Sequence, residues 1–165
     1  MATEELNAKI LRLLRRSARM SVAEMAARLD ACAEAVAEAI VEMEADGTIM
    51  GYSAVINADR LPQQEVRAII EVEVQPRRDG GFDTVAMRLS KFPEVHSVYL
   101  VSGRCDLRLE VVGTSLQDIG SFVASKLASQ EGVKATATHF LLKKYKEAGV
   151  RLQEDEQYER LKVVP

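Results

Sequence analysis

The apolar positions of the first fifty residues recur at helical spacing in three successive segments. In the first segment they share one face of a helix: Leu6, Ile10, Leu13 and Leu14. Ser21 with Glu24 three residues later forms a capping box, which predicts the start of a second helix. Apolar residues repeat again over 32–46, and Gly47 suits the left-handed residue that ends a helix. The pattern therefore predicts three helices.

The pattern then changes from helical to extended. Residues 48–56 are rich in β-branched and aromatic side chains and predict a strand. The second and third helices form a helix-turn-helix, and the strand after them is expected to be its wing. Residues 57–64 are polar and contain a proline, which is typical of a linker.

The second half of the chain alternates strands with amphipathic helices. Strands are predicted over 66–74, 95–101, 106–112 and 133–142, helices over 82–92 and 115–129, and loops over 75–81 and 102–105. This βαββαβ order indicates an antiparallel sheet with two helices on one face, the ferredoxin-like arrangement. Residues 143–165 have two interpretations, a solvated extension or an arm packed on a partner subunit.

The predicted fold class is therefore α+β, with an N-terminal winged helix-turn-helix followed by a ferredoxin-like domain. The expected boundaries are 1–57 for the first domain, 58–65 for the linker, 66–142 for the second domain and 143–165 for the extension. A chain of 165 residues with 47% hydrophobic and 28% charged side chains has the composition of a folded globular protein. It contains no apolar run long enough to span a membrane, and we expect a cytoplasmic protein.

Charge and cysteine content limit the chemistry further. A net charge of −3 creates no overall attraction for nucleic acid, so any DNA site must be local. Cys32 and Cys105 lie far apart in sequence, which excludes a CxxC redox pair and a cysteine-rich zinc cluster. We expect no metal and no cofactor.

Three sequence motifs, in this order and spacing, resemble the Lrp/AsnC or feast/famine family of regulators. They are Lys9–Leu14, Gly47–Tyr52 and the Gly-x-x-Asp turn with its following strand, Gly103–Val112. The resemblance implies a sequence-specific DNA-binding transcriptional regulator. It further implies a second domain that pairs two chains through their sheets, supports tetramers or octamers, and binds a small effector, usually an amino acid, between subunits.

The third helix departs from this family because it is acidic. Cys32 stands where a capping serine is usual, and residues 31–46 contain five acids but no Lys or Arg. Glu34, Glu38 and Glu42 form one stripe, and carboxylates repel the phosphates that line a DNA groove. Three interpretations follow: one glutamate reads a cytosine amine, the stripe is a solvated surface, or DNA binding is weakened and the chain serves as a ligand sensor or hetero-oligomer partner.

Two sets of candidate site residues follow. The basic residues of the first two helices are candidates for phosphate contact, or else form a solvated face or ion pairs with the acids of the third helix: Arg12, Arg16 or its neighbour Arg15, Arg19 and Arg28. The resemblance implies an effector site at Gly103, Asp106, Thr136 and Thr138. Capping of the turn is the alternative role of Asp106.

Catalysis has little support in the sequence, and we predict no enzyme and no catalytic residue. His96 and His139 are the two histidines, each within a predicted strand, and no phosphate-binding loop or nucleophile–base pair is recognisable. Haem-pathway decarboxylases share this two-domain architecture, so an enzyme is kept as a remote alternative.

Overall fold

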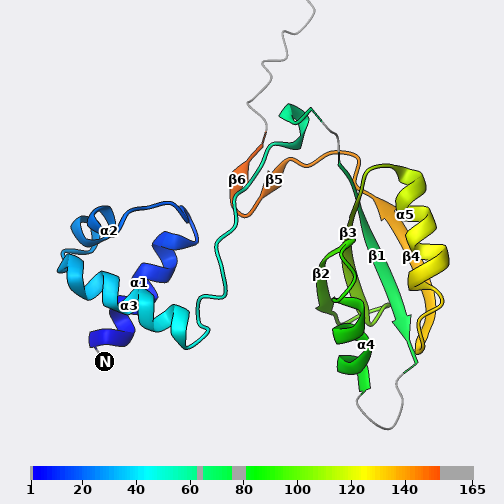
Figure 1. Cartoon of the computed structure of the whole chain (residues 1–165), viewed down its shortest axis with the longest axis horizontal. Coiled ribbons are helices and arrows are strands. Elements are labelled where there is room, and N and C mark those ends of the chain that lie inside the picture. The colour runs from blue at the N-terminus through cyan, green and yellow to red at the C-terminus, as the bar shows by residue number, and fades with distance from the viewer. Residues whose placement is uncertain (1, 63–64, 76–80, 153–165) are drawn as a thin grey trace, which may run out of the picture. The chain divides into compact units, whose positions relative to one another are not determined.

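Three helices form the N-terminal part of the structure, a computed structural model that describes residues 2–62, 65–75 and 81–152 (Figure 1). They are α1 (Ala2–Leu14), α2 (Val22–Leu29) and α3 (Ala33–Ala45). The predicted cap of α2 is confirmed, because the Ser21 hydroxyl accepts the backbone N–H of Glu24 at 3.2 Å. The helix-turn-helix connection passes through Asp30, whose φ of 51° is left-handed.

The three helices enclose a small apolar core. Its buried members come from all three helices: Ile10, Met25, Ala26, Val36, Ala39 and Met43. Leu6, Leu13 and Leu14, from the predicted face of the first helix, pack partly buried around this core. Burial of this stripe explains why short helices are stable here.

The strand predicted over 48–56 is wrong: those residues adopt no helix or strand, and no wing forms. The chain is held to the end of α3 by local hydrogen bonds instead. Asp46 accepts the backbone N–H of Thr48 at 2.7 Å, and the Tyr52 hydroxyl donates to Glu44 at 2.7 Å. High β-propensity does not make a strand without a neighbouring strand to complete its hydrogen bonds.

A four-stranded antiparallel sheet forms the second part of the chain. Its elements are β1 (Val66–Val74), α4 (Gly81–Leu89), β2 (Val95–Leu100), β3 (Leu107–Gly113), α5 (Leu116–Phe122) and β4 (Val133–Phe140). The strand order is β2-β3-β1-β4, and β1 pairs with both β3 and β4. The predicted ferredoxin-like βαββαβ fold is confirmed.

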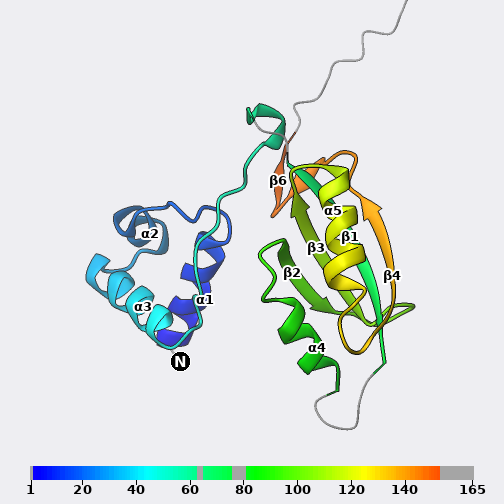
Figure 2. The ribbon, with the colours of Figure 1, turned by 45° about the vertical axis from the view of Figure 1, so that its right-hand side comes forward.

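One face of this sheet is buried under both helices. Figure 2 shows α4 and α5 on the same side of the strands. Alternate residues of β1 are fully buried there, Ala68, Ile70 and Val72 among them, and they pack with Leu89 of α4 and Ile119 of α5. Among the described residues of this unit, no helix covers the opposite face, so the sheet has a covered face and an open face.

In the second half, β2, β3 and β4 differ from their predicted limits by one or two residues, and two helices differ further. The helix predicted over 115–129 divides into α5 and a π-helical segment, η2 (Val123–Leu127). Ser115 caps α5 as expected, accepting the N–H of Asp118 at 3.0 Å. The helix predicted over 82–92 ends at Leu89, four residues before Pro93.

The C-terminal extension begins with structure that its sequence did not predict. A short hairpin forms from β5 (Lys146–Glu147) and β6 (Val150–Arg151). Its two turn residues, Ala148 and Gly149, have φ of 44° and 86°, the geometry of a tight two-residue hairpin turn. Residues 153–165, and 76–80 of the loop predicted over 75–81, lie outside the described residues.

The chain forms two compact units, one with the three helices and the hairpin, the other spanning Asn57–Tyr145. A short 3-10 helix, η1 (Ala58–Arg60), interrupts the predicted linker. The functional assignment of the four predicted segments stays a prediction.

The close approach of α5 to Gly113 at the end of β3 predicts a stability effect. A Cβ on Gly113 would lie 2.9 Å from Cγ1 of Ile119, which is buried. We expect Gly113→Ala to lower the free energy of unfolding by about 1–3 kcal/mol because the core must shift. Gly120→Ala is the control: its Cβ would meet nothing within 4 Å, and we expect a gain of about 0.5–1 kcal/mol. Urea unfolding followed by circular dichroism measures both, and equal values would contradict the account.

Candidate functional site

Cationic side chains gather at the end of α1 and in the connection to α2. Arg12 lies in the last turn of α1, whereas Arg16 and Arg19 lie in the connection. All three are exposed, and none forms an ion pair within the described residues. The predicted alternative of ion pairs with the acids of α3 is therefore not formed. These arginines are available to a phosphate, since such contacts come from flexible exposed cations.

The other candidate phosphate contact is already paired. The Arg28 guanidinium binds the Glu24 carboxylate at 2.8 Å, one turn earlier on α2. Both side chains are about half exposed, so the pair contributes little stability and can exchange for another anion. Arg15, which sequence spacing could not separate from Arg16, is equally exposed and unpaired in the described chain. Arg15 therefore joins the candidate set.

The acidic stripe of α3 is fully formed and exposed. Glu34, Glu38 and Glu42 are exposed and form no ion pair with any described Lys or Arg. Cys32 precedes α3 but does not cap it; its thiol donates to the Glu34 carboxylate instead. This hydrogen bond, with one from the backbone N–H of Glu34, lowers the pKa of Glu34 and keeps its carboxylate charged at neutral pH.

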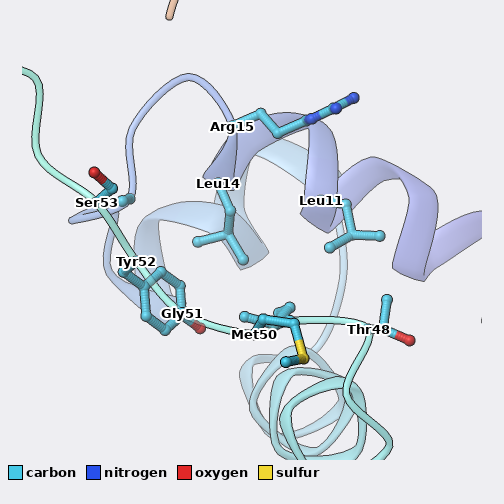
Figure 3. A pocket seen from close by; sticks show the side chains of 10 residues that line it. Leu11, Leu14, Arg15, Thr48, Met50, Gly51, Tyr52 and Ser53 are labelled. Carbon is cyan, nitrogen blue, oxygen red and sulfur yellow. The ribbon is translucent and has the colours of Figure 1, made fainter. Parts of the chain in front are cut away.

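A groove of about 480 Å³ runs between α1 and residues 48–53 (Figure 3). Leu11 and Leu14 point from α1 toward the segment that carries Met50 and Tyr52, while the Arg15 side chain extends away from it. Met50 is 90% exposed. Its lining mixes apolar side chains of α1 with polar groups of residues 48–53.

The candidate effector residues lie in two places on the sheet. Gly103, in the β2–β3 hairpin loop, has φ of 132°, which confirms that this turn requires a left-handed residue. Asp106 lies just before β3 and is partly buried; its carboxylate accepts the backbone N–H of Val74 at 2.7 Å. Its own N–H donates to the carbonyl of Val72 at 3.1 Å. Asp106 thus holds the end of β1, a long-range role that differs from the turn capping offered as its alternative from the sequence.

Thr136 and Thr138 lie on the covered face of β4. They stand opposite Val72 and Ile70 of β1, residues of the core, and are only half-buried. Asp106 is bonded to Val72 from the other side, so Thr136 lies two strands away, about 10 Å at ordinary strand spacing. One chain thus contributes candidate residues along one end of the sheet but does not bring them into direct contact. Their role toward an effector stays a prediction.

The two histidines do not form a catalytic arrangement with each other. His96 is exposed at an irregularity in β2, and His139 is exposed on the edge strand β4, 3.8 Å from Glu71. Within residues 2–62, 65–75 and 81–152, no group of three or more metal-ligating side chains was found. No helix in those residues is long and apolar enough to cross a membrane.

A three-helix head with a helix-turn-helix and a ferredoxin-like domain together define a class of two-domain regulators. Residues 67–151 match the Lrp/AsnC ligand binding domain. The HTH-type transcriptional regulator YugG of Bacillus subtilis is 37% identical over 166 aligned positions, covering 100% of both chains. The leucine-responsive regulatory protein of Rhizobium meliloti is 29% identical, and the match covers 88% of this chain and 92% of that one. The chain belongs to the Lrp/AsnC family of transcriptional regulators.

Solved structures support the fold. AsnC of Escherichia coli aligns with a TM-score of 0.66 at 20% identity, over 87% of this chain and 94% of that one. A transcriptional regulator of Neisseria meningitidis, solved in complex with L-methionine, aligns with a TM-score of 0.70 at 24% identity, over 89% and 95%. The two domains of these structures therefore have counterparts in this chain.

The Asp106 carboxylate predicts a difference between two substitutions. Asp106→Ala leaves the partly buried N–H of Val74 without its acceptor, and we expect a loss of about 1–2 kcal/mol in the free energy of unfolding. Asp106→Asn retains an oxygen acceptor and should cost less than half as much. Urea unfolding measures the free energy of unfolding of both variants. An equal loss in the two would show that the hydrogen bond from Val74 does not account for the stabilising effect of Asp106.

Proposed function

We propose that this protein is a DNA-binding transcriptional regulator that responds to a small-molecule effector, with an amino acid as the favoured class. The observation that carries the proposal is the pairing of a helix-turn-helix head with an Lrp/AsnC ligand binding domain in one chain. A helix-turn-helix binds duplex DNA, and the second domain supplies the effector response. As a regulator of transcription the protein acts in the cytoplasm, and it uses no cofactor and no catalytic residue.

Phosphate contact is assigned to Arg12, Arg16, Arg19 and Arg28, with Arg15 added from its exposure. Three of the predicted four are exposed and unpaired within the described chain, and the fourth forms a solvent-screened pair with Glu24. Arginine in such a position displaces counterions from the DNA backbone and fixes the orientation of the head without reading the sequence.

The effector site is assigned to the sheet end that holds Gly103, Asp106, Thr136 and Thr138. A loop with a left-handed glycine, a carboxylate and hydroxyl groups suits the ammonium and carboxylate ends of an amino acid. The residues of one chain are spread over two strands, which supports a site completed by a second subunit. The relative solved with L-methionine supports the ligand class.

The partners follow from this assignment. They are a second copy of the chain, further copies in a tetramer or octamer, duplex DNA and the effector. An effector bound between subunits shifts the population of assemblies only by its difference in affinity for them. Regulation therefore requires that the contacts between protein and effector differ between assemblies in which the DNA-binding heads are spaced differently.

Salt dependence of DNA binding tests the proposal. We expect duplex DNA from the protein's own promoter to raise fluorescence anisotropy on binding, with an affinity that falls steeply as salt increases and changes with an amino-acid mixture. Arg16→Ala and Arg19→Ala should each weaken binding and reduce the salt slope by about one. Lys91→Ala, an exposed cation at the end of α4, is the control. Salt-independent binding, or an equal loss in the control, would contradict the arginine assignment.

A second candidate function follows from the acidic stripe of α3. The exposed carboxylates of Glu34, Glu38 and Glu42, which form no ion pair within the described chain, favour a family member whose DNA affinity is weakened. Such a member would act as a ligand sensor or in a hetero-oligomer with a basic relative.

Neutralising the stripe distinguishes this candidate. If it is right, the wild-type chain binds no promoter DNA at low salt, and the triple variant Glu34→Gln, Glu38→Gln, Glu42→Gln gains salt-sensitive binding because the repulsion is removed. Asp83→Asn, which removes one carboxylate from α4 in the other domain, is the control for a general effect of lowering the negative charge. Tight binding by the wild-type chain, unchanged in the triple variant, would exclude the candidate and place the stripe away from the phosphates.

A further inference from the structure

The groove between α1 and residues 48–53 exposes large apolar side chains to water. Leu11 and Leu14 line it from α1, and Met50 and Tyr52 line it from the segment that follows α3 (Figure 3). Met50 is 90% exposed and Tyr52 is 50% exposed. Large apolar side chains that gather at an exposed groove indicate a surface that binds another segment of protein.

The cations of the head lie beside this groove. Arg15 belongs to the lining of the groove, and its side chain extends away from the apolar residues. Ala18, which also lines the groove, lies between Arg16 and Arg19 in the chain. With Arg12 these are four exposed arginines, and none forms an ion pair within the described residues. A binding partner that carries acids next to an apolar stretch is therefore complementary to this surface.

Residues 153–165 of this chain have that composition in their sequence. Four acids come first, with no Lys or Arg between them, and an apolar stretch follows. The acids are Glu154, Asp155, Glu156 and Glu159, and the apolar residues are Leu161, Val163, Val164 and Pro165. The acids match the exposed arginines in sign, and the apolar residues match the groove.

The position of the β5–β6 hairpin brings this segment within reach of the groove. The hairpin ends at Arg151 and belongs to the same compact unit as the three helices. A compact unit of about 60 residues has a radius of gyration of about 10 Å, whereas a segment of about 13 residues extends to roughly 40 Å. Residues 153–165 are therefore long enough to reach the groove from the end of the hairpin.

We propose that residues 153–165 bind the groove of their own head, with the acids on the arginines and the apolar stretch on Leu11, Leu14 and Met50. The bound segment covers the arginines to which phosphate contact is assigned, so it competes with DNA. The competition rests on the proposed function, whereas the binding of the segment to the groove does not. A weak contact is sufficient, because a tethered segment has an effective concentration on the order of millimolar.

The methyl signal of Met50 in NMR spectra reports whether the groove is occupied. In the full-length chain labelled with ¹³C at its methionine methyl groups, we expect the apolar triple variant, Leu161→Ser, Val163→Ser, Val164→Ser, to shift this signal. Met50→Leu identifies the signal by its disappearance. Met87, 66% exposed on α4 in the other unit, is the matched control, and its signal should not move. An unchanged Met50 signal overturns the binding of the segment to the groove.

Mixing distinguishes a chain's own segment from that of a second copy. The labelled apolar triple variant is mixed with an excess of unlabelled wild-type chain and allowed to exchange subunits. If each segment binds its own head, the Met50 signal of the variant stays in its shifted position. Its return to the wild-type position would show that the segment comes from another copy, and would overturn binding within one chain.

DNA affinity tests the competition. The apolar triple variant and the acid triple variant, Glu154→Gln, Asp155→Asn, Glu156→Gln, should each bind promoter DNA about tenfold more tightly than the wild type, as expected if about one tenth of the heads are free of the segment. The apolar triple variant keeps the net charge of the chain, so its gain excludes a general charge effect. Equal affinities of this variant and the wild type overturn the competition.

The outcomes separate this inference from the proposed function. If neither the wild type nor the two triple variants bind promoter DNA at low salt, the proposed function is overturned, and the competition with it. The methyl measurement still decides whether the segment binds the groove, because it uses no DNA. A shifted Met50 signal together with tighter DNA binding in both triple variants supports the proposal.

Discussion

The second domain depends on one constraint: one face of its sheet must be apolar and covered by helices, while the other face is polar. β1 lies between β3 and β4, and its alternate residues are fully buried under α4 and α5. A one-residue shift in register would exchange Ile70 for Glu71 in the core, so the hydrophobic pattern fixes the register as well as the fold. The same alternation places Arg67, Glu71 and Glu73 on the open face, and it therefore determines which side chains a partner can meet.

The three-helix head combines one apolar core, shared by α1, α2 and α3, with a surface on which cations and carboxylates lie on different segments. Ile10, Met25 and Val36 bring the three helices together, while the cations collect near the end of α1 and the carboxylates on α3. Opposite charges on one small unit do not neutralise each other here, because no ion pair joins the two sets in the described chain. The head thus presents a cationic surface and an anionic surface to its partners, which is why DNA binding and its weakening both have physical support.

Most of the second domain could be predicted because the spacing of its apolar residues in the sequence matches the positions that are buried in the structure. β1 is predicted over 66–74 and forms over Val66–Val74, and partly buried and fully buried positions alternate in it from Arg67 to Val74. The strand predicted at 48–56 is absent because β-propensity alone does not provide the neighbouring strand that its backbone hydrogen bonds would need. The π-helical segment after Phe122 and the hairpin at 146–151 depend on backbone hydrogen bonds that the spacing of apolar residues does not predict.

The candidate site was predicted less fully than the fold. The left-handed conformation of Gly103 followed from its turn, but the bond from Val74 to Asp106 joins residues that are 32 positions apart and could not be read from the sequence. Spacing also could not separate Arg15 from Arg16, because both leave the helix in the connection to α2. The family resemblance supplied the effector residues, and their role toward an effector stays a prediction.

The central claim is that the three-helix head is the part of the chain that meets DNA. Hydrogen exchange of backbone amides, measured by mass spectrometry with and without saturating promoter DNA, tests it directly. The account predicts slower exchange in 2–45, including the arginine-bearing connection between α1 and α2, with β1 to β4 unchanged. Protection confined to the sheet, or no protection anywhere under saturating DNA, would contradict it.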